Sequence, residues 1–248
     1  MIYVTGDVHG DFTRFSSDNF PEQKGMTKAD YVLICGDFGG LWDGSKRERY
    51  WLDWLEHKPF TTLFVSGNHE NYDLLAELPV AQWRGGRVQF LRPSILHLMR
   101  GQVYELAGKR LFTMGGAASH DIADGILDPA APNFRRQKRR LEARRAQYRV
   151  NRQSWWAEEL PSDAQYAEAE RNLAACGYSV DFIVTHCCPS GIANSLGEGQ
   201  YRPDRLTDYF AALAERCRFR YWFFGHYHDN RVIQQRYILL YEQIIRAV

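Results

Sequence analysis

Six short apolar runs, each ending at a glycine or a polar residue, most constrain how this chain folds. The runs are rich in β-branched and aromatic residues and do not alternate with polar ones. Runs of this kind are typical of strands that are buried on both faces of a sheet. They cover residues 2–5, 31–35, 62–66, 111–114, 182–185 and 221–224.

Helical segments with recognisable start signals lie between these runs. Ser45 and Glu48 fit a capping box before one helix, and Ser162 and Gln165 fit a capping box before another. Because strand and helix patterns alternate, we expect an α/β or layered α+β fold in a single domain over residues 1–248. Further expected elements are helices at 71–78 and 204–217 and a closing hairpin or edge pair at 232–245.

Residues 117–159 are the least regular part of the chain. They contain a basic run, 135–149, with eight Lys or Arg residues and one Glu, followed by Trp155 and Trp156. We expect the segment to be an insertion that caps one face of the domain, or else an exposed helix and loop. The basic run is interpreted as a solvated helix face or as a guide for a polyanion, and the tryptophans as core residues or as a platform for a base.

Composition excludes several classes of protein. Aromatic residues make up 14% of the chain, more than a disordered protein carries, and no stretch approaches ~20 uninterrupted apolar residues. The 31 Lys and Arg residues nearly balance the 30 Asp and Glu residues, so the net charge gives no pull toward nucleic acid or a membrane. The odd number of cysteines, two of them adjacent, and the acidic N-terminal stretch predict reduced thiols in a cytoplasmic protein.

Polar side chains follow five of the six predicted strands at the point where each strand ends. In layered α/β folds ligands bind outside the carboxyl ends of strands, and glycine there lets the backbone come close to a ligand. We therefore expect these side chains to converge on one site. They are Asp7 and His9 after the first run, Asp37 after the second, Asn68 after the third, His186 after the fifth, and His226 and His228 after the sixth.

Two carboxylates, four imidazoles and one amide are too many ligands for one metal ion and suit two ions that share a carboxylate. The mixed nitrogen and oxygen set favours manganese, iron, cobalt, nickel or zinc over magnesium or calcium, and manganese is the ion that we expect. Two divalent ions outweigh the charge of two carboxylates, so such a site would attract phosphate. The competing interpretation of any single histidine is a structural one, which we prefer for His57, His97 and His120.

At these residues the sequence resembles the calcineurin-like metallophosphoesterase superfamily. The matching blocks, 7–9, 36–37, 67–70, 185–186 and 225–228, occur in the order of the family pattern. The resemblance implies a layered sandwich of two mixed β-sheets, face to face and flanked by helices. It also implies two metal positions that share Asp37, the first held by Asp7, His9, Asp37 and His228 and the second by Asp37, Asn68, His186 and His226.

The same resemblance implies two-metal-dependent hydrolysis of phosphomonoesters, phosphodiesters or both. A hydroxide that bridges the metals attacks phosphorus in line, and His69 acts as general acid for the leaving oxygen. The alternative for His69 is a structural role beside the metals. The expected substrate is a small phosphate ester, with no membrane partner.

Departures from one branch of the family bear on the substrate. The protein Ser/Thr phosphatase branch carries an Asp-Arg pair soon after the bridging aspartate, whereas here no arginine follows Asp37 until Arg47, although Glu70 does resemble that branch. Asp43 and Asp121 are the candidates for orienting the general acid. A protein phosphatase-like activity, a nuclease that uses the basic run, and a non-catalytic scaffold are the alternatives to a small-ester phosphoesterase.

Two further blocks, 115–121 and 154–159, resemble little-characterised bacterial members of the superfamily. Residues 115–121 follow the predicted strand at 111–114, just as the blocks with the proposed metal ligands follow their strands. Two alternatives therefore stay open for Ser119, His120 and Asp121, that they reach the metal site from their own strand end or that they do not.

Overall fold

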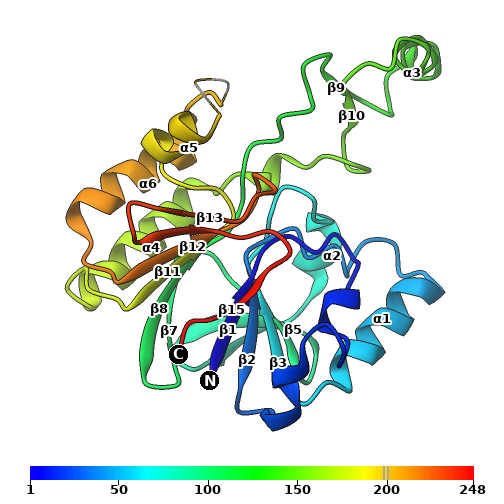
Figure 1. Ribbon diagram of the computed structural model, residues 1–248. Coiled ribbons are helices and arrows are strands. Elements are labelled where there is room, and N and C mark those ends of the chain that lie inside the picture. The colour runs from blue at the N-terminus through cyan, green and yellow to red at the C-terminus, as the bar shows by residue number, and fades with distance from the viewer. Residues whose placement is uncertain (198, 200) are drawn as a thin grey trace.

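The computed structural model describes residues 1–197, 199 and 201–248, and its centre is two mixed β-sheets that pack face to face (Figure 1). The first sheet has the order β15 (Ile244–Arg246), β1 (Ile2–Thr5), β2 (Tyr31–Ile34), β3 (Thr61–Phe64), β6 (Ile95–Leu98), β5 (Gly86–Arg92) and β4 (Val80–Trp83). The second has the order β13 (Arg231–Ile233), β14 (Tyr237–Leu239), β12 (Tyr221–Phe224), β11 (Phe182–Thr185), β8 (Lys109–Met114) and β7 (Gln102–Leu106).

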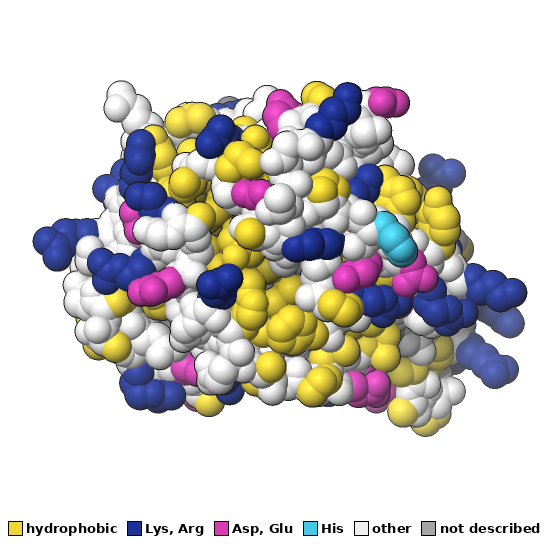
Figure 2. All heavy atoms as spheres, turned by 90° about the horizontal axis from the view of Figure 1, so that it is seen from below, with side chains coloured by type: hydrophobic (Ala, Val, Ile, Leu, Met, Phe, Trp, Pro, Cys, Tyr) yellow, Lys and Arg dark blue, Asp and Glu magenta, His cyan; other side chains and the backbone are white. Residues whose placement is uncertain are grey.

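The central strands of each sheet run parallel, which places their carboxyl ends along one edge. In the first sheet β1, β2, β3 and β6 are parallel, and in the second β8, β11, β12 and β14 are parallel. The opposite end of the molecule, seen in Figure 2, has hydrophobic side chains gathered near its centre with Lys and Arg side chains around them. The polar strand-end residues therefore lie at the other end, where the two sheets meet.

Neighbouring residues of one strand enter different layers of the core, which explains the unbroken apolar runs. Leu33 of β2 lies between the sheets, in one hydrophobic cluster with Phe182 and Phe223 of the second sheet. Val32 and Ile34 of the same strand point outward, into the cluster that includes the helix residues Leu52 and Leu55. A strand that is covered on both faces needs apolar residues at every position.

The helices cover the outer faces of the two sheets, except the one at Phe134–Ala143, which extends away from them. They are α1 (Lys46–Glu56), α2 (Tyr72–Glu77), α3 (Phe134–Ala143), α4 (Asp163–Ala175), α5 (Ser190–Leu196) and α6 (Arg205–Arg216), with 3-10 turns η1 (Thr13–Phe15), η2 (Pro21–Gly25) and η3 (Ala157–Glu159). The capping box at Ser162 is complete. At α1 only half of the predicted box forms, because the Glu48 carboxylate accepts hydrogen bonds from the backbone of Trp42, Asp43 and Gly44 instead of Ser45.

The six predicted strands and four predicted helices are confirmed within about two residues at each end, which is the usual uncertainty of element boundaries. Both interpretations of the C-terminal stretch are correct in part, because β13 and β14 form an antiparallel pair while β15 adds to the edge of β1. The sequence patterns do not predict the strands between residues 80 and 106, nor α5. Exposed and partly buried positions alternate in β4, so its sequence carries no continuous apolar run.

Residues 117–159, which we call the arm, extend away from the sheets in Figure 1. The arm contains α3 and a short parallel ladder of β9 (Ile126–Leu127) with β10 (Arg149–Val150), and no residue of α3 is buried. At the base of the arm Trp156 is buried, and its Nε1 donates a hydrogen bond of 2.8 Å to Asp73. Trp156 is therefore a packing residue. None of the helices in the described ranges has the length and apolar character that crossing a membrane requires.

Candidate metal centre

The loops that follow β1, β2, β3, β11 and β12 meet at one edge and bring the predicted residues together. Asp7, Asp37 and His186 are at most 1% exposed, and Asn68 is buried as well. A buried carboxylate needs a cation or several hydrogen-bond donors nearby, because burial without a partner is costly. The surroundings of the two aspartates therefore show what the site is built to hold.

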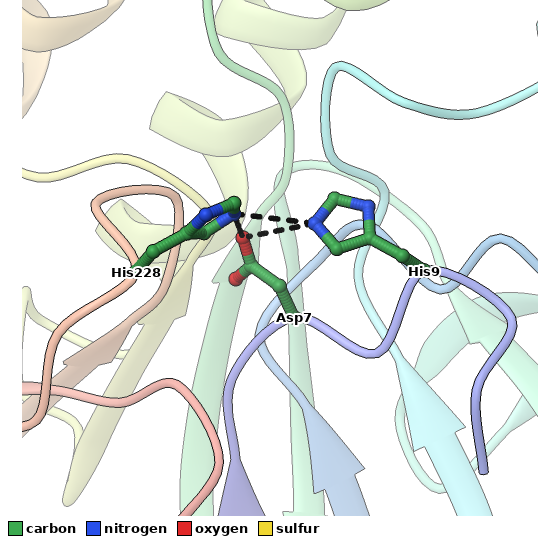
Figure 3. A group of neighbouring side chains, drawn as sticks. All are labelled: Asp7, His9 and His228. Carbon is green, nitrogen blue, oxygen red and sulfur yellow. Dashed lines mark hydrogen bonds and ion pairs between the residues drawn. The ribbon is translucent and has the colours of Figure 1, made fainter.

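Three side chains form the first donor group, drawn in Figure 3. Nε2 of His228 lies 3.1 Å from Oδ2 of Asp7, and Nε2 of His9 lies 3.2 Å from Nε2 of His228. Nε2 of His9 is also 3.9 Å from Oδ2 of both Asp7 and Asp37. Separate loops thus direct their donor atoms at one small space.

A second donor group lies deeper, around His186. Its Nε2 is 3.3 Å from Oδ1 of Asp37 and 3.1 Å from Oδ1 of Asn68. Its Nδ1 lies 2.7 Å from the backbone carbonyl oxygen of Cys35, which can only accept. Nδ1 therefore carries a proton and Nε2 is the atom that faces the two oxygens, which is the usual arrangement of a histidine that binds metal.

The spacing of these donor atoms fits transition metal ions. Ligands at about 2.1 Å from a metal and at right angles to each other lie about 3 Å apart, and the separations of 3.1 to 3.3 Å within the two groups are close to that. In the described part of the chain, the ion-pair partners of Asp7 and Asp37 are all histidines. The residues present therefore fit divalent cations, which would neutralise both carboxylates.

The pKa values of the buried groups reflect the close approach of the carboxylates and the histidines. Burial raises the pKa of Asp37, but the charges of His186, His69 and His9 outweigh it and hold the pKa well below its usual range. Burial lowers the pKa of His186, but Asp37 and Asp7 outweigh it and raise the pKa to about 9. In the metal-free protein a proton on His186 therefore balances the negative charge of the two aspartates, and a bound cation would balance the same charge.

The backbone of the site is held in unusual conformations. His9, Asp37, His226 and His228 have φ between 48° and 71°, the left-handed region that residues with a Cβ rarely adopt. Two glycines pass so close to the aspartates that a Cβ on either one would collide with a carboxylate. They are Gly67, beside Asp37, and Gly225, beside Asp7. The surrounding structure must maintain these arrangements, and strained backbone of this kind clusters at functional sites.

His226 lies at the edge of the centre. Its backbone N–H donates to the carboxylate of Asp7 at 2.9 Å, and its ring centroid is 4.9 Å from that of His186. Its Nε2, however, lies 2.6 Å from Nε2 of His120. The loop that follows β8 therefore brings His120 to the edge of the site, as one of the two alternatives for this residue anticipated. The glycine pair before it, Gly115 and Gly116, was the available signal.

His69 lies at the edge of the metal centre as well, in contact with Asp37 and His9. Its backbone N–H donates to Oδ1 of Asp37 at 2.8 Å, and its ring packs at a steep angle to that of His9. Burial lowers the pKa of His69. Its Nε2 lies 3.4 Å from Nη2 of Arg149 on the arm.

Asp121 and Asp43, the two candidates for orienting His69, differ in how they are connected to it. Nε of Arg149 donates to Asp121 at 2.9 Å, so Asp121 is linked to His69 through that arginine. The carboxylate of Asp43 accepts from the backbone N–H of Ser45 at 2.8 Å, and no hydrogen bond joins it to His69 in the described ranges. The sequence shows Arg149 only as part of the basic run, because its neighbour in space, His69, is 80 positions away in the chain.

The paired donor groups at the meeting edge of two mixed sheets are typical of hydrolases that act on phosphate esters. The chain matches the family model described as calcineurin-like phosphoesterase over residues 1–230, and it belongs to this family. The resemblance identified from the sequence and the layered fold that it implied are both confirmed.

The individual proteins that the chain resembles share less than 30% identity with it. The chain is similar to lariat debranching enzyme A of Xenopus laevis, with 27% identity over 143 residues, 51% of this chain and 26% of that protein. The similarity to the lariat debranching enzyme of Homo sapiens is 26% identity over 143 residues, 51% of this chain and 25% of that protein. The chain thus spans about a quarter of the length of these relatives.

Proposed function

We propose that this chain is a two-metal-dependent phosphoesterase that hydrolyses phosphomonoesters, phosphodiesters or both, within a single domain over residues 1–248. One observation carries the proposal. The two oxygens of Asp37 face different groups, Oδ2 toward His9 and Oδ1 toward His186. A buried carboxylate placed in this way is suited to bridge two cations.

The ligand sets that we propose follow from this arrangement. The first ion would be held by Asp7, His9, Asp37 and His228, and the second by Asp37, Asn68, His186 and His226. Manganese is the ion that we expect, and iron, zinc, cobalt or nickel suit the same nitrogen and oxygen donors. Bound there, two divalent ions would supply Lewis acidity and an activated water for in-line attack on phosphorus.

The remaining steps fall to side chains of the chain itself. We assign His69 the role of proton donor to the leaving oxygen, through Nε2. The Arg149 guanidinium, which now contacts that atom, would turn to a phosphate oxygen in the substrate complex and free the ring for this role. Asp121 would keep Arg149 near the site during this movement.

The arm and the relatives support a second candidate, a nuclease. All of α3 lies outside the core, and an open cavity of about 660 Å³ lies between the arm's helix and β10, lined by Lys138, Asp121 and Arg149 among others. The arm would then act as a cap that guides a polyanion. The likeness to lariat debranching enzymes points in the same direction. A protein phosphatase-like activity is a further alternative, for which Arg149 would supply the missing arginine.

The test begins with metal content. The full chain, purified without metal and titrated with Mn²⁺, is expected to bind two ions and then to hydrolyse p-nitrophenyl phosphate or bis(p-nitrophenyl) phosphate. A chelator should abolish the activity. Metal-loaded protein that hydrolyses neither ester nor single-stranded nucleic acid would support the scaffold alternative. Activity on nucleic acid alone, lost when the charges of α3 are neutralised, would favour the nuclease.

A further inference from the structure

We propose that Glu159 and Ser119 fix the orientation of the Asn68 side-chain amide and thereby make its oxygen, rather than its nitrogen, face the second metal position. These two are positioning residues, which act through Asn68. The inference rests on the proposed function, because it assumes that Asn68 is a metal ligand. It concerns residues from the two ends of the arm.

Three hydrogen bonds connect the residues in a chain. Nδ2 of Asn68 lies 3.3 Å from Oγ of Ser119, and Oγ of Ser119 lies 2.6 Å from Oε2 of Glu159. The other carboxylate oxygen, Oε1, accepts from the backbone N–H of Ser119 at 2.9 Å. Glu159 is 3%, Asn68 5% and Ser119 7% exposed, so little water competes with these bonds.

The chemistry of the three groups allows only one direction. An ionised carboxylate can only accept, so the Ser119 hydroxyl must donate its single proton to Glu159. The hydroxyl oxygen is then left as an acceptor, and only the NH₂ group of the Asn68 amide can donate to it. The amide oxygen must therefore point the other way, toward Nε2 of His186, where it lies 3.1 Å from that atom.

This orientation matters because an amide has two ends of similar size and opposite chemistry. With the amide reversed, NH₂ would face Nε2 of His186, and an amide nitrogen is not a ligand for a divalent cation. The energy difference between the two orientations is supplied by the hydrogen-bond network. A carboxylate at position 159 thus decides the chemistry at a metal position that it does not touch.

The position of Glu159 is itself secured by the fold. Nη2 of Arg100 donates to the backbone oxygen of Glu159 at 3.1 Å, and Gly116 passes so close to that oxygen that a Cβ there would collide with it. On the preceding side, Trp156 is anchored to Asp73. The carboxylate therefore reaches Ser119 from a rigid base, as a positioning residue requires.

The test compares Glu159→Gln with Glu158→Gln in the full chain. A glutamine side chain at position 159 would keep the shape of the native glutamate but could donate to Ser119, which removes the preference for one amide orientation. Glu158 is exposed and pairs with Arg152, so its variant controls for a charge change one residue away. The readout is direct titration of metal-free protein with Mn²⁺, followed by calorimetry.

We expect Glu159→Gln to weaken binding of one of the two Mn²⁺ ions about 10- to 100-fold, while the other ion and the Glu158→Gln variant behave as wild type. Ser119→Ala, which removes the hydroxyl, should give the same loss and replaces Glu159→Gln if that variant does not fold. Wild-type affinity for both ions in Glu159→Gln or Ser119→Ala would overturn the proposal, as would an equal loss in Glu158→Gln. Wild-type protein that binds no Mn²⁺ would instead refute the proposed function.

Discussion

Nε2 of His69 lies 3.4 Å from Nη2 of Arg149, a residue 80 positions further along the chain. A guanidinium can only donate hydrogen bonds, so Nε2 accepts and the ring proton lies on Nδ1 in this arrangement. The arm thus places an arginine beside His69, the proposed proton donor, whereas the stretch that directly follows Asp37 contains no arginine. This contact connects the arm to the proposed chemistry and leads to the first prediction.

Replacing Arg149 by Gln should lower kcat/KM for aryl phosphates about 10- to 100-fold, because one hydrogen bond to a charged group contributes about 1.5–3 kcal/mol. Arg139→Gln, on the exposed α3 helix, is the control for loss of one positive charge in the arm. Steady-state kinetics at several salt concentrations measure both variants. An equal loss in both would mean that the arm acts only through its overall charge.

His69→Asn should reduce kcat by about 10²–10⁴-fold for substrates with a poor leaving group, which need a proton donor. The loss should be smaller for p-nitrophenyl phosphate, because its leaving group departs without protonation. Both Mn²⁺ ions should stay bound, since the His69 imidazole is not among the proposed ligands. Equal losses for phenyl phosphate and p-nitrophenyl phosphate would remove His69 from the role of general acid.

Gly67→Ala and Gly225→Ala should each impair metal binding, because the added methyl group would displace the carboxylate of Asp37 or Asp7. We expect fewer than two Mn²⁺ ions per chain by elemental analysis after dialysis. Gly191→Ala is the matched control, since Gly191 lies in α5 with open space around the added Cβ. Normal metal content in both site variants would show that the loops can move to admit the methyl group.

His97 should make the fold less stable in acid. Burial lowers its pKa from 6.5 to about 3, so between these values the unfolded state binds a proton that the native state does not. The free energy of unfolding should therefore fall as the pH drops below about 6.5, by up to about 1.4 kcal/mol per pH unit from this group.

Urea denaturation between pH 7 and pH 4.5 measures this effect. His97→Gln should show a smaller loss of stability over that range than the wild-type protein, whatever its stability at pH 7. His57→Gln, at an exposed position after α1, is the control and should keep the wild-type dependence. A pH dependence in His97→Gln as steep as in the wild type would assign the acid sensitivity to other groups.

Sequence patterns predicted the central strands and the main helices because these elements satisfy local rules. A strand covered on both faces is almost entirely apolar, as residues 31–34 and 182–184 are, and helices such as α4 begin at a capping box. The strands from 80 to 106 follow no such rule. In β4, β5 and β7 partly exposed positions accept polar residues, and the buried strand β6 is interrupted by His97.

The sequence alone determined which side chains stand at the strand ends, since each follows its strand directly in the chain, and this was enough to predict a metal site and its family. Only the tertiary structure decided the contacts between distant segments: His120 beside His226, Arg149 beside His69, and Glu159 behind Asn68. The reason is physical. Strand-end positions follow from local periodicity, whereas the path of the arm depends on which side chains pack and hydrogen-bond at its base.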